Sequence, residues 1–148
     1  TVPMFDKGMN ILPFWDYAFD NGGVASMNYY TEKFMGLLLV DQQSGEVSDI
    51  VREGEPAMAY SVVLAPDHKR AYAVMDDLTV IDLAKRKYVA SVPIREGTCY
   101  GVNVSADGRK IYVAGGGSTL TVYDAATLKP LKVLQMASDG MDLRRIAF

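Results

Sequence analysis

A tandem repeat of about 40 residues runs through most of this 148-residue chain and constrains its fold more than any other feature. Three apolar runs end in aspartate at intervals of 41 and 42 residues, at positions Asp41, Asp82 and Asp124. A second alignment agrees, because residues 65–73 match residues 105–113 at an offset of 40. A glycine recurs at 54, 97 and 140. The chain is therefore predicted to contain several copies of one structural unit.

Each copy contains short segments that are typical of β-strands, with turn residues between them. In the clearest copy, Val102 and Val104 alternate with small or polar residues, the period of two expected of a half-buried strand. Three more strands are predicted there, over 110–114, 120–123 and 131–136. The preceding copy is predicted to repeat this pattern over 61–64, 70–74, 78–81 and 88–92. Four antiparallel strands in a repeat of about 40 residues are typical of a β-propeller blade.

We therefore predict an all-β fold, a partial β-propeller of about three four-stranded blades plus one inner strand. The whole chain, 1–148, is interpreted as a single incomplete propeller domain. Its expected parts are an irregular, aromatic-rich blade (1–52), two regular blades (53–93 and 94–136) and the inner strand of a further blade (137–148), where Ile146 and Phe148 alternate. Closed propellers typically have about four to eight blades. We expect a piece of a larger protein, although another polypeptide could instead complete the ring.

The first 35 residues differ from the rest because they are rich in methionine and aromatic side chains. The aromatic residues there are Phe5, Phe14, Trp15, Tyr17, Phe19, Tyr29, Tyr30 and Phe34. We expect a strand over 24–30 and an irregular insertion in this blade, since the spacing to Asp41 fits the later copies poorly. Such enrichment can mark an interface. The core of a blade, together with a surface that faced a further blade, would have the same composition.

Charge and composition argue against several classes of function. Fifteen basic and eighteen acidic residues give a net charge of −3, which provides no electrostatic footprint for nucleic acid or an anionic membrane. No apolar run approaches the roughly 20 residues of a membrane-spanning helix. The N-terminus lacks a signal-peptide pattern, although a secreted parent could carry one upstream. The single cysteine, Cys99, excludes an internal disulfide, a multi-cysteine zinc site and a cysteine-held iron–sulfur cluster.

Two features that could carry chemistry have a simpler structural interpretation. The glycine run 115–118 is similar to a phosphate-binding loop, but such a loop must open a helix. A strand follows here, so a hairpin turn is favoured. His68 is the only histidine, whereas a zinc or copper site usually needs more ligands of this kind. Because Gly108 takes its place in the next copy, we expect His68 to be a solvated turn residue rather than a catalytic base.

The aspartates of the repeat also have a structural interpretation. Asp41, Asp82 and Asp124 each end a strand, where an aspartate accepts a hydrogen bond from its own turn. Asp76 and Asp77 could bind a cation with help from other blades, as in metal-dependent propeller hydrolases, but the next copy has glycines there. One histidine does not allow a Ser-His-Asp arrangement to be assigned. We therefore assign no catalytic, cofactor-binding or metal-binding residue in this chain.

Blade topology places two groups of loops on opposite faces. The loops from one blade to the next (53–60, 96–100 and 138–142) share a face with those between second and third strands (75–77 and 115–118). We call this the docking face. It gathers large side chains suited to docking a partner or to lining an entrance: Met58, Tyr60, Met75, Tyr100 and Met141. The opposite, charged face offers Asp67, His68, Lys69, Arg70, Asp107, Arg109 and Lys110. We predict that a partner subunit contacts the docking face.

Two stretches of the last full copy, 100–113 and 120–128, resemble the repeat of the Tyr-Val-Thr-Asn class of seven-bladed propellers. Over about 35–148, including 36–41 and 44–46, the chain more closely resembles the C-terminal blades of the β subunit of quinohaemoprotein amine dehydrogenase. This resemblance implies a seven-bladed parent that acts as a non-catalytic scaffold in the bacterial periplasm. In that family a small subunit carries a tryptophylquinone that oxidises primary amines, and a dihaem cytochrome subunit takes the electrons.

The resemblance further implies that the propeller docks both of these partner subunits and itself holds no cofactor, with haem c and the quinone confined to the partners. The sequence agrees in having no Cys-x-x-Cys-His motif for haem attachment. Two other classes of function stay open. One is a general protein-interaction propeller without redox partners. The other is a metal-dependent propeller hydrolase such as a lactonase, which would need acidic or amide ligands that converge on the channel.

Overall fold

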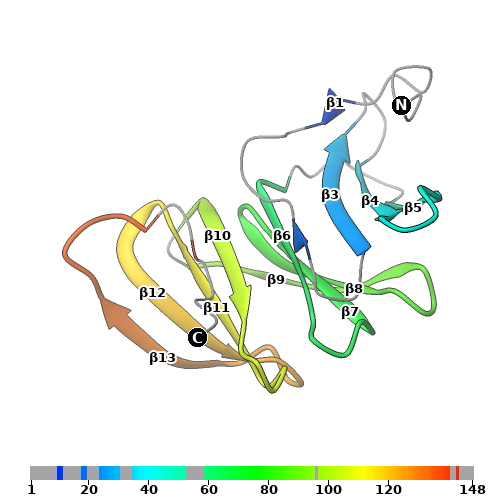
Figure 1. Cartoon of the computed structure of the whole chain (residues 1–148). Helices are drawn as coiled ribbons and strands as arrows, with labels where there is room; N and C mark the ends of the chain where they lie inside the picture. Colours follow the sequence, from blue (N-terminus) through cyan, green and yellow to red (C-terminus); the bar gives the residue numbers. More distant parts are fainter. Residues whose placement is uncertain are drawn as a thin grey trace.

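The computed structural model describes residues 10–11, 18–19, 24–30, 35–52, 59–95, 97–140 and 143. These residues form 13 strands in three antiparallel sheets, which follow one another along the chain as successive blades (Figure 1). No helix occurs in this part of the chain, and hence none that is long and apolar enough to cross a membrane. The predicted all-β, partial propeller is thereby confirmed.

The second and third blades are regular sheets of four strands, each paired with the next strand along the chain. The second blade contains β6 (Ser61–Leu64), β7 (Arg70–Val74), β8 (Asp77–Asp82) and β9 (Lys87–Pro93). The third contains β10 (Cys99–Val104), β11 (Lys110–Gly115), β12 (Gly117–Asp124) and β13 (Pro130–Gln135). The strands predicted in both blades are confirmed, with ends that move by at most three residues.

The first blade is irregular on its inner side. β3 (Val24–Tyr30), β4 (Met35–Asp41) and β5 (Val47–Arg52) form a regular antiparallel sheet. Two short strands, β1 (Asn10–Ile11) and β2 (Ala18–Phe19), both pair with β3 and together take the place of one inner strand. Residues 12–17 separate these two strands, whereas only Met27 and Asn28 separate their partners on β3. The predicted insertion and the predicted strand over 24–30 are both confirmed.

The core lies between consecutive blades, because alternate side chains of each strand point to opposite sides of its sheet. On one side, the second blade packs against the first through these buried residues: Met35, Leu37, Ile50, Val62, Leu64, Ala71, Ala73 and Ile81. On the other side, it packs against the third through Tyr72, Val74, Leu78, Val80, Val102, Val104, Ile111, Val113 and Tyr123. Burial of each large aliphatic side chain contributes about 1.5–3 kcal/mol. The blades therefore stabilise one another, as neighbouring repeats do.

The segment that follows the third blade is described only in part. Asn103 of β10 donates a 2.8 Å hydrogen bond from Nδ2 to the carbonyl oxygen of Leu143, so this segment passes beside the third blade's inner strand. Ile146 and Phe148, on which the predicted inner strand of a further blade depends, lie outside the described residues.

Candidate functional site

Two tyrosines from consecutive blades stack on the docking face. Tyr60 directly precedes β6, and Tyr100 is the second residue of β10, so each stands where an inner strand begins. Their ring centroids are 5.0 Å apart and their planes are inclined by 28°, a stacked arrangement favoured for aromatic pairs. Both side chains are half-buried. Because inner strands line the channel of a propeller, the pair lies at the boundary of two blades beside the channel entrance.

Hydrogen bonds between loops hold this part of the docking face together. The backbone N–H of Cys99 donates to the carbonyl oxygen of Met75 over 2.8 Å. The Thr98 hydroxyl donates to Oδ1 of Asp76, also over 2.8 Å. Both bonds join the β7–β8 loop of the second blade to the segment that leads into the third. Tyr100 follows directly, so its position is fixed relative to the second blade.

The glycine run 115–118 allows a close approach of two backbone segments. A Cβ on Gly115 would lie 2.3 Å from the Cα of Cys99, and one on Gly116 would lie 2.6 Å from the carbonyl oxygen of Thr98. The N–H of Gly116 donates to that same oxygen over 2.7 Å. The predicted hairpin is confirmed, although β11 and β12 continue further into the run than predicted, since Gly115 pairs with Gly117.

A similar contact recurs one blade further along. The Ser118 hydroxyl, near the start of β12, donates to Oδ1 of Asp139 over 3.3 Å, so the third blade is also bonded to the segment that follows it. In the second blade the roles are reversed, because the blade supplies the acceptor, Asp76, and the following segment supplies the donor, Thr98. Sequence reasoning missed both contacts. The recurring glycine at 97 and 140 could have indicated these contacts, because Thr98 follows the first of these glycines and Asp139 precedes the second.

The structure brings together three of the five residues proposed to face a partner. Tyr60 and Tyr100 stack, and Met75 is half-buried in the loop bonded to the segment before Tyr100. Met58 and Met141 lie outside the described residues. The described part of the docking face therefore provides a pair of stacked aromatic rings next to loops that backbone and hydroxyl hydrogen bonds join.

The adjacent carboxylates Asp76 and Asp77 have separate hydroxyl partners. Asp76 accepts from Thr98, whereas Asp77 accepts through Oδ2 from the hydroxyl of Ser91 on β9 over 2.9 Å. One carboxylate therefore serves a contact between blades, and the other serves the outer strand of its own blade. In the described ranges, no three His, Cys, Asp or Glu side chains gather closely enough to hold a metal ion.

On the charged face, the recurring aspartates cap their own turns as predicted. Oδ1 of Asp124 accepts from the N–H groups of Ala126 and Thr127 over 3.0 and 2.7 Å. Asp41 and Asp82 accept equivalent bonds from the N–H groups of Ser44 and Lys85. Backbone hydrogen bonds from Thr127, Ser44 and Lys85 are the largest cause that holds the pKa of each carboxyl below its usual value. These carboxylates thus have a local structural role.

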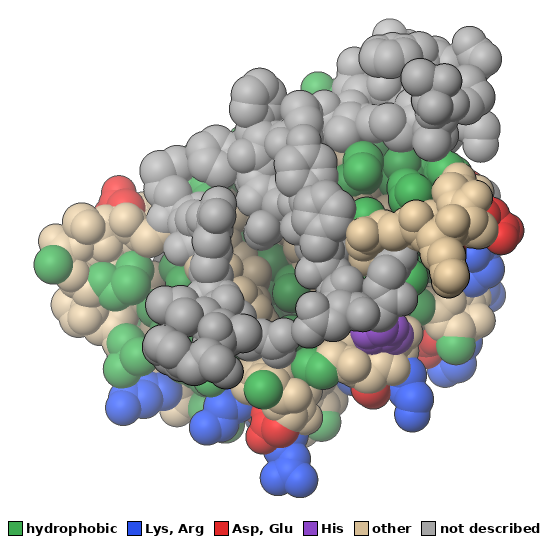
Figure 2. Space-filling view, viewed as in Figure 1, with side chains coloured by type: hydrophobic (Ala, Val, Ile, Leu, Met, Phe, Trp, Pro, Cys, Tyr) green, Lys and Arg blue, Asp and Glu red, His purple; other side chains and the backbone are tan. Residues whose placement is uncertain are grey.

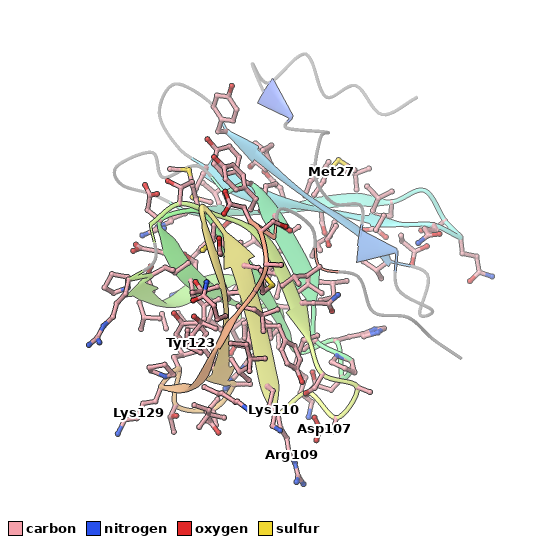
Figure 3. The ribbon with its side chains drawn as sticks, turned by 90° about the vertical axis from the view of Figure 1, so that its left-hand side faces the viewer. Met27, Asp107, Arg109, Lys110, Tyr123 and Lys129 are labelled. Carbon is pink, nitrogen blue, oxygen red and sulfur yellow. The ribbon has the colours of Figure 1, made fainter. Side chains whose placement is uncertain are left out.

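The turns that precede the second strands are built alike. Asp67 and Asp107 each accept through Oδ1 from the N–H two residues later, over 3.0 Å. The residue between is left-handed in both turns, with φ of 55° at His68 and 71° at Gly108. His68 is exposed, so the predicted solvated turn position is confirmed. Figure 3 shows Asp107 and Arg109 at one end of the third blade, with Arg109 directed away from the sheets.

An open groove of about 720 Å³ separates the second and third blades on the charged face. One wall is the β6–β7 turn with the start of β7, and the other consists of the β10–β11 and β12–β13 turns. The guanidinium of Arg70 crosses it and donates from Nη1 to the carbonyl oxygen of Ala125 over 3.3 Å. Figure 2 shows Lys and Arg side chains along the lower edge of the molecule, where these turns lie.

The arrangement of sheets defines this chain as part of a β-propeller, and comparison with solved structures agrees. Hydrazine synthase of Kuenenia stuttgartiensis superposes with a TM-score of 0.63 at 16% sequence identity. The match covers 78% of this chain and 34% of that chain, so this chain spans about a third of its length. At this sequence identity, the structural similarity shows a shared fold alone. No family model matches the chain, and no curated protein is similar enough to assign a family.

Proposed function

We propose that this chain provides blades of a non-catalytic propeller scaffold whose docking face binds a partner protein. The observation that carries the proposal is the stack of Tyr60 on Tyr100 beside the channel entrance. Tyrosine is enriched among the residues that dominate binding energy at protein interfaces. Because the two rings already support each other, a partner would bind them with a smaller loss of side-chain freedom than it would bind separate, mobile rings.

The polar groups around the stack support a docking role. Asp76 and Thr98 satisfy each other, and the carbonyl oxygen of Met75 is bonded to Cys99. These groups hold the loops in place and are not directed at a substrate. The surface that remains for a partner is aromatic, which favours recognition of a protein.

We further propose that the complex is a periplasmic one, similar to quinohaemoprotein amine dehydrogenase. Its partners would then be a dihaem cytochrome subunit and a small quinone-bearing subunit, which together oxidise primary amines. The sequence resemblance supports this: its two clearest stretches, 100–113 and 120–128, form β10 to β12 and their turns in the regular third blade. Haem c and tryptophylquinone would belong to the partners, and this chain would hold none.

The test is co-purification from the native organism with a tagged full-length protein. We expect replacement of Tyr60 and Tyr100 by alanine to weaken partner capture at least about tenfold. The matched control, phenylalanine at both positions, keeps the stack and should keep capture. Captured material should show the absorption of haem c and should reduce an artificial electron acceptor when a primary amine is added.

Other outcomes would replace parts of the proposal. Unchanged capture by the alanine variant, with loss on charge reversal at Arg70 and Arg109, would mean that the partner binds the charged face. Capture of partners without haem or amine oxidation would favour a general protein-interaction propeller. Hydrolysis of a lactone by the purified protein, abolished by a chelator, would favour a metal-dependent hydrolase.

A further inference from the structure

Buried polar atoms without a hydrogen-bond partner gather at one boundary between blades. In the described ranges there are four such side-chain atoms: Oγ of Ser26, Oδ1 of Asn28, Nη1 of Arg52 and Oη of Tyr88. The first two lie on β3, next to the inner strands, and the other two lie on the outer strands β5 and β9. A buried polar atom without a partner costs free energy, so each of these atoms needs a partner beyond the described side chains.

Ser26 and Asn28 face the second blade. They lie on the same side of β3 as Val24, which packs in the cluster between the first and second blades. Ser26 is 0% exposed and Asn28 is 6% exposed. β3 lies beside β6, whose Val62 and Leu64 belong to the same cluster. Because aliphatic side chains neither donate nor accept hydrogen bonds, the facing side chains of β6 leave both oxygens unsatisfied.

The boundary between the second and third blades is built differently at the same place. By its register against the third strand of its blade, Ser26 corresponds to Tyr72 of the second blade. Asn28 corresponds to Val74 in the same way. Tyr72 and Val74 pack in the cluster with the third blade, and Tyr72 is hydrogen-bonded to Arg70. The first boundary instead has smaller side chains, which take less space, and polar ones, which supply hydrogen bonds. Room and polar partners are the two conditions for a buried water molecule.

At the outer strands, the two groups without a partner are hydrogen-bond donors. The guanidinium of Arg52 lies over the ring of Tyr88, with Cζ 5.9 Å from the ring centroid. Burial raises the pKa of Tyr88, so its hydroxyl keeps its proton. Arg52 is half-buried, so bulk water still solvates part of its charge and no counter-ion is required. A neutral acceptor is therefore sufficient for these two donors.

We propose that buried water molecules join the first and second blades at these two places. One donates to Oδ1 of Asn28 and bonds to the hydroxyl of Ser26, which lies two residues away on the same side of the strand. The other accepts from Nη1 of Arg52 and Oη of Tyr88. Water fits both places because it donates and accepts, whereas a metal cation binds acceptors alone and an anion binds donors alone. None of these four residues is among those proposed to face a partner, so the water sites are independent of the proposed docking function.

A high-resolution crystal structure of the full-length protein is the direct test. We expect one water molecule within hydrogen-bond distance of Ser26 Oγ and Asn28 Oδ1, and another within that distance of the Arg52 and Tyr88 atoms. The equivalent place at the second boundary, beside Tyr72, is the matched control and should hold none. Absence of water at either place, a protein side chain there, or a metal ion identified by anomalous scattering would overturn the proposal. Equal hydration of both boundaries would also overturn it, because the polar side chains would then not be the cause.

Two conservative variants test the water sites in solution. Ser26→Ala and Tyr88→Phe each remove one hydroxyl oxygen and change the rest of the side chain little. We expect each to lower the ratio of folded to unfolded protein about fivefold in denaturant unfolding, since a hydrogen bond of ordinary net strength is lost. A hydroxyl that binds no water would give the opposite sign, a rise of about fivefold or more, because the cost of an unsatisfied buried group disappears. A rise, or no change, in either variant would overturn the proposal.

Discussion

The ring of Tyr29 occupies the space that a side chain at position 36 would need. These residues pair across β3 and β4, and a Cβ on Gly36 would lie 2.4 Å from Cζ of Tyr29. Tyr29 is only 1% exposed, and its hydroxyl donates to Oδ2 of Asp49 on β5 over 2.8 Å. The ring therefore spans the three regular strands of the first blade and has little freedom to move aside.

This relationship predicts that Gly36→Ala destabilises the first blade. We expect a loss of about 1–3 kcal/mol in the free energy of unfolding, typical of overpacking in a filled core. Denaturant unfolding of Gly36→Ala, Tyr29→Ala and the double variant measures the coupling between the two positions. The clash should disappear when the ring is removed. A cost for Gly36→Ala that is the same with and without Tyr29 would show that the ring is not its cause.

The glycine run predicts an effect on the docking face. Gly116→Ala should separate the β11–β12 hairpin from Thr98, because the added methyl group meets the Thr98 carbonyl oxygen. We expect loss of the bond from the Gly116 N–H and a displaced Tyr100. Tyrosine fluorescence and chemical shifts of the Tyr60 and Tyr100 ring protons would report the change in stacking. Ring signals identical to those of the unaltered protein would contradict this prediction.

The paired turns at 68 and 108 predict changes of opposite sign. His68→Gly should raise the free energy of unfolding by up to about 1 kcal/mol, since glycine adopts a left-handed backbone without steric cost. Gly108→Ala should lower it by about 1–2 kcal/mol, because Cβ meets the backbone in this conformation. Thermal and denaturant melts of both variants check the pair. If both variants, or neither of them, were more stable than the unaltered protein, the left-handed backbone would not be the cause.

The capped aspartates predict a loss of stability in acid. Their pKa values in the folded chain lie below the ordinary value of 3.8, so the unfolded chain binds protons first. Their contribution is fully present above about pH 4 and is lost as the pH falls through the folded values. Unfolding midpoints at decreasing pH should therefore fall less in a variant with asparagine at Asp41, Asp82 and Asp124, which keeps an acceptor but does not titrate. An equally steep fall would assign the acid sensitivity to other groups.

Strands and turns could be predicted because both depend on local sequence. The period of two and the turn residues placed β6 and β7 with their observed ends. The aspartates were assigned to their turns because an aspartate bonds N–H groups only two or three residues away. Topology then placed the docking loops on one face, since the direction of antiparallel strands alternates along each blade.

Which residues meet across blade boundaries depends on how whole sheets pack against each other. Tyr60 and Tyr100 occupy equivalent places in successive repeats, and the repeat predicts one face for both but no contact. Whether the two rings touch depends on the rotation between blades and on the side-chain rotamers. The hydrogen bond from Arg70 to the carbonyl oxygen of Ala125 depends on the same two factors. Short-range periodicity and turn chemistry, both visible in the sequence, are enough to predict the blades. The stacked pair and the groove arise from packing between whole sheets, which no local pattern encodes.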